Sequence, residues 1–257
     1  MSGRALLPVA AGGLAVLGAA ALVAAVTIPP SNGAAPSPST SSGPRSTPSA
    51  PARTPAPVPT ATVHAAHLPL PERADADWVA RTARAAGVPP RALAAYAGAA
   101  LAVADTHPTC GLGWNTLAAI GEVESAHGTL QGGAVGADGR VQPRVVGVPL
   151  DGSPGVAAIR DTDGGVLDGD TAWDRAVGPM QFLPGTWAEH AQDGDRDGAS
   201  DVDDLDDAAL AAAVYLCDAG GDLTDPAGWI AAVHAYNPSA EYNARVAGAA
   251  ERLAALP

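Results

Sequence analysis

The sequence contains no lysine, so all 14 of its basic residues are arginines, against 27 acidic residues. No acidic residue precedes Glu72, and the first 71 residues hold three arginines. The rest of the chain therefore carries 11 arginines against 27 acids, a net charge of −16. Nucleic-acid binding needs a basic surface, and this balance argues against that class of partner. It suits a divalent cation or an uncharged sugar polymer, or solubility alone.

The sequence also lacks the signatures of nucleotide-binding α/β proteins. It shows no βαβ alternation, no glycine-rich phosphate loop and no internal repeat. Asp225-Pro226 is typical of a helix start, with an N-cap followed by proline at the first helical position. Only Val145–Val148 is a candidate for extended structure. The expected helices span residues 74–86, 90–104, 114–127, 185–191, 205–218, 226–236 and 240–255, which predicts a mainly α domain.

No charge interrupts residues 5–28, an apolar run that follows Arg4. The run is longer than the ~7–15 residues of a signal-peptide core and close to the ~20 that span a bilayer. We expect residues 1–30 to be a signal anchor, with a cleaved signal peptide as the alternative. Residues 31–67, rich in Pro, Ser, Thr and Ala, have the composition of a disordered linker. The folded domain, residues 68–257, is expected outside the cytoplasm, either anchored to the membrane or secreted.

The chain has only two cysteines, Cys110 and Cys217, and both fall in the expected folded domain. An even count in an exported protein favours a disulfide, which would close a loop of about a hundred residues. Two buried free thiols are the alternative. We therefore expect a Cys110–Cys217 bridge that stabilises the domain by a few kcal/mol.

The helix NTLAAIGEVESAHG carries two carboxylates, of which one lies on the apolar face. Leu117, Ile120 and Gly121 share a face with Glu124 by their spacing, whereas Glu122 points elsewhere. Burial and the negative end of the helix dipole both raise the pKa of a carboxyl group at this position. A protonated carboxyl near neutral pH is what a general acid needs. The alternative is a glutamate that caps the helix end or pairs with an arginine.

Two further stretches have the composition of a ligand cleft. In AVGPMQFLPGTW, Gln181 is an amide among apolar groups, which suits a sugar hydroxyl or N-acetyl group. The alternative is a core segment whose glutamine binds to backbone. In HAYNPSAEY, a helix breaks at Pro238, where Tyr236 and Asn237 either face a cleft or cap a turn.

Residues 193–204, DGDRDGASDVDD, follow the calcium loop of an EF-hand. The loop places carboxylates at alternate positions and a glycine where the chain turns sharply, as a hard cation requires. Because the twelfth position is aspartate rather than the longer glutamate, bidentate ligation there is less favoured. The alternative is an acidic, solvated turn. The expected ligands of Ca²⁺ are Asp193, Asp195, Asp197, the carbonyl of Ala199, Asp201 and Asp204.

Together, VESAHG, GPMQFLPGTW, the aspartate loop and AYNPSAEY resemble the lytic murein transglycosylases of the membrane-bound lytic transglycosylase B type. The resemblance covers about residues 88–255, with the motifs in the same order. It implies a lysozyme-like (α+β), mainly helical fold with an EF-hand-like calcium loop, preceded here by the anchor and the linker. The stretch DTDGGVLDGDTAWD, residues 161–174, has no place in that pattern.

Site residues follow from the resemblance position by position. The family's catalytic acid corresponds to Glu124, with Ser125 after it in the substrate cleft. The family's cleft glutamine corresponds to Gln181, and its Tyr-Asn pair to Tyr236 and Asn237. The aspartate loop corresponds to the family's calcium site.

The resemblance implies a peptidoglycan substrate, cleaved between N-acetylmuramic acid and N-acetylglucosamine with formation of 1,6-anhydromuramoyl ends, by a chain that acts as a monomer. That reaction uses one carboxylate as acid and then as base, whereas glycoside hydrolysis normally uses two. If an aspartate of residues 161–174 lies about 5–9 Å from Glu124, a hydrolytic muramidase is the alternative. A non-catalytic wall-binding module, stiffened by calcium, is an alternative of another class.

Overall fold

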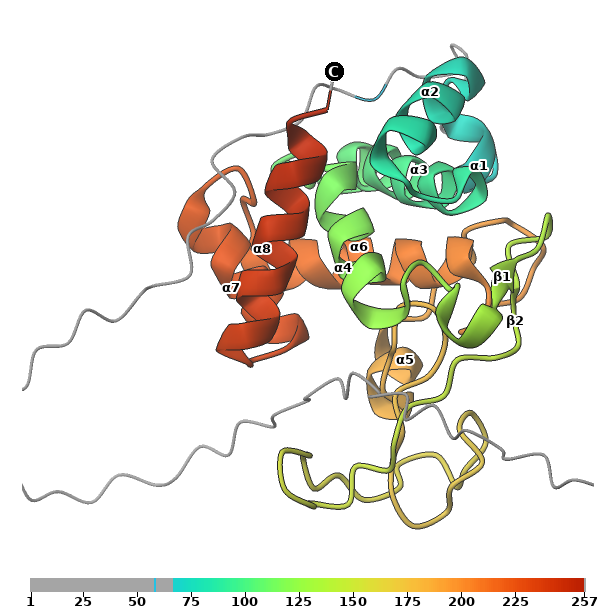
Figure 1. Cartoon of the computed structure of the whole chain (residues 1–257), viewed down its shortest axis with the longest axis vertical. Helices are drawn as coiled ribbons and strands as arrows, with labels where there is room; N and C mark the ends of the chain where they lie inside the picture. Colours follow the sequence, from blue (N-terminus) through green and yellow to red (C-terminus); the bar gives the residue numbers. More distant parts are fainter. Residues whose placement is uncertain (1–57, 59–66, 257) are drawn as a thin grey trace, which may run out of the picture.

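The computed structural model describes Val58 and residues 67–256 of the chain (Figure 1). The expected signal anchor, residues 1–30, lies outside the described residues, as does nearly all of the expected linker. Within the described part, no helix combines the length and the apolar character that crossing a membrane requires.

The described part is mainly helical, as the sequence predicts. Most of the expected helices occur within two residues of their expected ends, and a short first helix was not expected. The helices are α1 Leu70–Arg73, α2 Ala76–Ala86, α3 Pro90–Thr106, α4 Trp114–Ser125, α5 Pro184–His190, α6 Leu205–Gly220, α7 Pro226–Tyr236 and α8 Ala240–Ala254.

Helix α6 lies at the centre of the fold, with α3 and α7 packed against it, while α4 packs against α8 (Figure 1). Small side chains allow this close packing, because many alanines on α3 and α6 are buried. Gly121 on α4 is one such contact: a Cβ there would collide with the hydroxyl of Tyr96 on α3. The glycine therefore sets how closely α4 approaches α3.

Side-chain caps explain where helices α7 and α8 begin. The Asp225 carboxylate accepts the N–H of Gly228 at 3.3 Å and Pro226 occupies the first turn, which confirms the predicted start of α7. The Ser239 hydroxyl accepts the N–H of Tyr242 at the start of α8. This cap places Tyr242 in the first turns of α8.

Helix α4 ends two residues before the predicted boundary. Ala126, His127 and Gly128 all have positive φ, at 49°, 60° and 78°. Ala126 and His127 donate backbone N–H groups to carbonyls within α4, and the Ser125 hydroxyl accepts the N–H of Gly128 at 2.7 Å. These bonds offset the strain of left-handed non-glycine residues and turn the chain sharply after Glu124.

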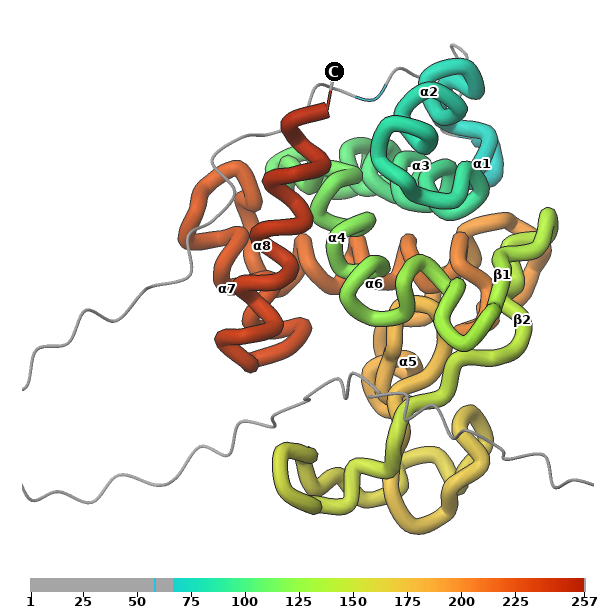
Figure 2. Tube along the Cα trace, viewed as in Figure 1, coloured from blue at the N-terminus to red at the C-terminus, as the bar shows by residue number. Residues whose placement is uncertain are grey.

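The extended segment occurs elsewhere than predicted. Val145–Val148 forms no strand, and Val146 makes only an isolated bridge with Val177. The two-stranded antiparallel sheet consists of β1 Ala134–Val135 and β2 Val141–Gln142. Strands of two residues are too short to show an alternating pattern in a sequence. Residues 145–175 form loops that lie below α5 (Figure 2).

A disulfide joins Cys110 and Cys217, as predicted. It connects the segment after α3 to the last turns of α6, across 107 residues of sequence. Leu223 N–H also donates to the Cys110 carbonyl at 2.7 Å beside the bridge. The bridge therefore holds the helix pair that positions α4 against the central helix.

Candidate active site

Helix α4 places Glu124 in its last turn, on the face turned toward the core. The Glu124 side chain is buried, with the residue 7% exposed, and burial raises the pKa of its carboxyl group to about 7. The neighbouring acid differs: Glu122 is partly exposed and forms an ion pair with Arg252 at 2.5 Å. The prediction that Glu124 faces the core while Glu122 does not is confirmed.

A tyrosine that the sequence analysis did not assign contacts this acid. The Tyr242 hydroxyl donates a hydrogen bond to Oε1 of Glu124 at 2.7 Å. This bond and the nearby positive charge of Arg245 both lower the pKa of Glu124, but they only partly offset the effect of burial. Tyr242 ends the motif AYNPSAEY, six residues beyond the tyrosine that we expected at the site.

The GPMQF motif forms a tight hairpin beside the acid. Val177 and Phe182 exchange backbone hydrogen bonds of 2.8 and 2.9 Å, so the residues between them form the loop. Gly178 has a φ of 76°, and a Cβ there would collide with the carbonyl of Val202. Only glycine satisfies both constraints, which explains the first residue of the motif.

Two hydroxyl groups clamp the tip of this hairpin. Ser125 Oγ donates to the carbonyl of Pro179 at 2.6 Å, and the Tyr236 hydroxyl donates to the carbonyl of Met180 at 2.8 Å. The ends of α4 and α7 therefore meet at one loop. Three separate sequence motifs converge next to Glu124 as a result.

The clamp changes the role that we expected for Ser125. Ser125 is fully buried, donates to Pro179 and accepts the N–H of Gly128. Its hydroxyl is occupied by these two bonds, so the structure gives Ser125 a positioning role rather than the substrate-binding role predicted.

Asn237 also departs from the prediction. The residue is 2% exposed, and its side-chain oxygen accepts the N–H of Ser239 at 3.0 Å. Its carbonyl accepts a bond from Asn243 at 2.6 Å. The turn-capping alternative therefore describes Asn237, and the reason is that the break at Pro238 leaves the start of α8 in need of polar partners.

Gln181 lies at the end of the hairpin, partly exposed, with a φ of 52°. Its amide nitrogen donates to the carbonyls of Gly178 at 2.9 Å and Val145 at 3.4 Å. Among the described residues, none donates a hydrogen bond to its oxygen, Oε1. Gln181 is thus held by its nitrogen and presents one acceptor.

Part of the expected calcium loop comes together as predicted. Carboxylate oxygens of Asp193, Asp195 and Asp197 lie within 4.8 Å of one another between α5 and α6. Burial and the neighbouring carboxylates raise the pKa of Asp195, as expected where acids cluster. Oxygen donors at this spacing fit a hard divalent ion such as Ca²⁺.

The other two expected carboxylates, Asp201 and Asp204, do not join this group. Asp201 pairs with Arg140 at 2.5 Å, and the buried Asp204 carboxylate caps α6 by accepting the N–H of Asp206 at 2.8 Å. Because α6 begins at residue 205, the twelfth position falls at the helix cap and is used there. Asp207 instead faces the loop, since its carboxylate accepts the N–H groups of Gly194 and Asp201 at 2.6 and 2.8 Å.

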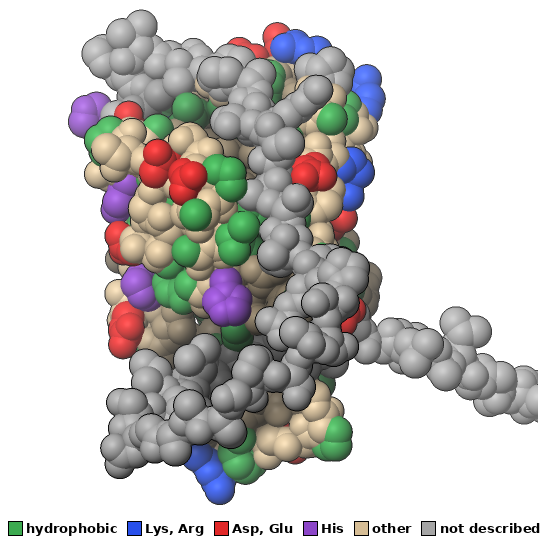
Figure 3. Space-filling model, turned by 90° about the vertical axis from the view of Figure 1, so that its left-hand side faces the viewer, with side chains coloured by type: hydrophobic (Ala, Val, Ile, Leu, Met, Phe, Trp, Pro, Cys, Tyr) green, Lys and Arg blue, Asp and Glu red, His purple; other side chains and the backbone are tan. Residues whose placement is uncertain are grey.

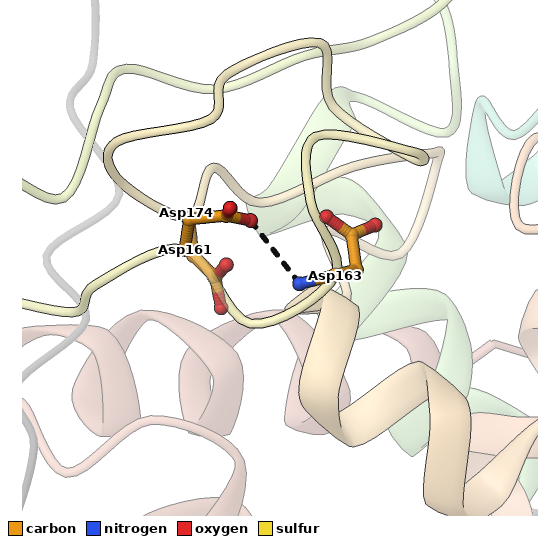
Figure 4. Close-up of side chains that lie close together, drawn as sticks. All are labelled: Asp161, Asp163 and Asp174. Carbon is orange, nitrogen blue, oxygen red and sulfur yellow. Dashed lines mark hydrogen bonds between the residues drawn. The ribbon is translucent and has the colours of Figure 1, made fainter.

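Asp161, Asp163 and Asp174 lie close together in a second acidic loop (Figure 4). Oxygens of Asp161, Asp163 and Asp174 lie within 4.8 Å of one another. Asp161 Oδ1 accepts the N–H of Asp163 at 3.1 Å, and Asp174 accepts both the N–H and the hydroxyl of Thr162 at 2.8 Å. Asp170 binds Arg175. These carboxylates order their own loop.

Acidic and histidine side chains are spread over the visible face of the molecule in Figure 3, while basic side chains lie toward its edges. The described surface on this face therefore has none of the basic stripe that a nucleic-acid backbone requires.

Residues 157–252 match the family described as "Transglycosylase SLT domain". No curated protein and no solved structure matches the chain. The matched region includes the hairpin, the aspartate loop, Tyr236 and Tyr242, and it begins after Glu124. This match to a transglycosylase domain, in a mainly helical protein, supports peptidoglycan lytic transglycosylase activity in general, with peptidoglycan as the substrate.

Proposed function

We propose that the domain cleaves the β-1,4 bond between N-acetylmuramic acid and N-acetylglucosamine and leaves 1,6-anhydromuramoyl ends. One observation carries this proposal. Glu124 is a buried carboxyl group with a pKa of about 7, held by Tyr242 where three motifs meet. A carboxyl group with a pKa close to neutrality can both give and take a proton near neutral pH.

The reaction then needs only one protein carboxylate. Glu124 donates its proton to the glycosidic oxygen, the C1–O bond breaks, and positive charge develops at the anomeric carbon. The ionised Glu124 takes the proton of the muramoyl C6 hydroxyl while that oxygen bonds to C1. The proton count closes without water, and the acid returns to its starting state.

The environment of Glu124 favours this scheme over hydrolysis with two carboxylates. Tyr242 and Arg245 are the side chains that act on its pKa, and no aspartate of the described residues is among them. The aspartates at 161, 163, 170 and 174 accept hydrogen bonds within their own loop. These carboxylates therefore already serve to order that loop.

Gln181 is the residue that we assign to substrate binding on this geometry. Its Oε1 accepts no bond from the described residues, so it can accept one from a sugar hydroxyl or N-acetyl N–H. Tyr236 supports the position of Gln181 indirectly, because its hydroxyl holds the hairpin through the carbonyl of Met180.

We also propose that the aspartate loop binds Ca²⁺ through Asp193, Asp195 and Asp197, with Asp207 closing the loop from α6. Bound calcium would supply positive charge to a cluster whose carboxylates repel one another. The disulfide supports a location outside the cytoplasm. The apolar run in residues 1–30 is proposed to anchor the domain there.

Mass spectrometry of peptidoglycan digested by the full-length protein and by Glu124→Gln tests the reaction. We expect anhydromuramoyl ends from the wild type and none from the variant. Reducing muramic acid ends would instead establish a hydrolase. Peptidoglycan that is bound but not cut by either protein would establish a wall-binding module.

A further inference from the structure

Two arginines lie seven residues apart on α8, which places them on the same side of the helix, facing the end of α4. Arg252 pairs with Glu122 at 2.5 Å. Arg245 is exposed and, among the residues that the structure describes, forms no ion pair or hydrogen bond through its guanidinium group. Arg252 therefore has a carboxylate partner within the protein, whereas Arg245 has none among the described residues.

Arg245 lies beside the proposed catalytic acid. It follows Tyr242 by three residues, a spacing that puts both side chains on one face of α8. Tyr242 bonds to Glu124 at 2.7 Å, and the charge of Arg245 acts electrostatically on both of these groups. An exposed positive charge is thus present within electrostatic range of Glu124.

Several arginines of the described residues pair with a carboxylate. Acids outnumber basic residues by 27 to 14, and Arg91, Arg140, Arg144 and Arg175 each pair with an aspartate. Arg245 has no such partner among the described residues. Its exposure next to Glu124 leaves a guanidinium fork that matches a carboxylate in two parallel hydrogen bonds.

We propose that Arg245 binds a carboxylate of the muramoyl residue next to the cleaved bond. This inference rests on the proposed function. The sugar rings of the substrate are uncharged, so its carboxylates come from two sources. One is the lactyl group of muramic acid, which is free when the stem peptide has been removed. The other is the stem peptide itself.

Binding measurements on a full-length Glu124→Gln protein separate these sources without cleavage. The first pair of ligands is a peptide-free tetrasaccharide of alternating N-acetylglucosamine and N-acetylmuramic acid, and the same compound with its lactyl groups converted to methylamides. The second pair carries stem peptides with free or amidated carboxyl groups. Isothermal titration calorimetry gives Kd for each ligand.

We expect the free carboxylate of one pair to bind about tenfold more tightly than its amide. Adding Arg245→Gln should abolish this preference, Arg245→Lys should retain part of it, and Arg252→Gln should leave it intact. The pair that shows the effect identifies the source of the carboxylate. Arg252 is a matched control because it removes the same charge from the same side of α8.

Three results would overturn the inference: no preference for either carboxylate, a preference that survives Arg245→Gln, or equal loss with Arg252→Gln. The inference would also be overturned if Arg245→Gln left the binding preference unchanged and only moved the pH dependence of cleavage in the protein that retains Glu124. That result would indicate an electrostatic effect on Glu124 alone. Failure to bind any of these glycans would reject the proposed function as well.

Discussion

The hydroxyl of Tyr242 lies 2.7 Å from Oε1 of Glu124 and donates a hydrogen bond to it. The bond joins the first turns of α8 to the last turn of α4, where two helices pack side by side (Figure 1). It fixes the direction of a carboxyl group that burial alone would leave free to rotate. It also favours the ionised form, and so limits how far burial raises the pKa.

Tyr242→Phe should therefore change both the rate and its pH dependence. Removing a donor to the ionised carboxylate raises the pKa of Glu124, which is about 7 in the wild type. Because the protonated acid is the active form, the alkaline limb of kcat/KM should move to higher pH. The loss of orientation should lower kcat/KM by about tenfold at pH 6, as measured by release of soluble muropeptides.

Tyr236→Phe is the control for that experiment. This change removes the bond to the Met180 carbonyl and leaves the Tyr242–Glu124 bond in place. It should lower activity without moving the alkaline limb. An identical shift of the limb in both variants would mean that Tyr242 acts through general packing.

Glu124→Gln should stabilise the protein at high pH while abolishing cleavage. The pKa of Glu124 is raised from 4.5 to about 7 on folding, so the folded state resists ionisation of this group. The resulting cost is absent below pH 4.5, grows between pH 4.5 and 7, and reaches about 3 kcal/mol above pH 7. Denaturant unfolding at pH 4.5 and pH 8 should show a gain only at pH 8. An equal gain at both values would contradict the assigned pKa.

Calcium should stabilise the wild type through the aspartate loop. Removing it with a chelator should lower Tm, and adding it at about 100 times Kd should restore up to about 2.7 kcal/mol. Asp195→Asn should abolish the response because it removes one of three converging carboxylates. Asp163→Asn, in the second acidic loop, is the matched control and should keep the response. The reverse pattern would move the ion to residues 161–174.

Reducing the disulfide should cost about 2–5 kcal/mol of unfolding free energy, because the bridge closes a loop of 107 residues. Thermal unfolding with and without reductant measures this cost. The double variant Cys110→Ser/Cys217→Ser should be insensitive to reductant and already destabilised. A wild type indifferent to reductant would show that packing of α3 on α6 is sufficient.

Features with a local physical cause were predictable from the sequence. The start of α7 follows from the cap at Asp225, and the burial of Glu124 follows from the spacing of its apolar neighbours. The disulfide follows from the expectation of export and an even cysteine count. Each of these depends on residues close in sequence or on a count.

Features that depend on contacts between distant segments were not predictable. Ser125 bonds to a carbonyl 54 residues away, and Tyr242 bonds to a carboxylate 118 residues away. The spacing of apolar residues in a sequence does not indicate hydrogen-bond partners this far apart. Asp204 was misassigned for a related reason, because position twelve of the loop pattern coincides with a helix cap only once the start of α6 is known.

The hairpin clamp has a consequence for how the enzyme could be divided. The acid and one of the two clamping hydroxyls come from Glu124 and Ser125, while the hairpin and the other hydroxyl come from residues 177–182 and Tyr236. A break in the exposed segment near Gly152 would leave each fragment with half of the machinery. Activity recovered on mixing such fragments would report their reassembly directly, since neither half contains both the acid and the tyrosine that orients it.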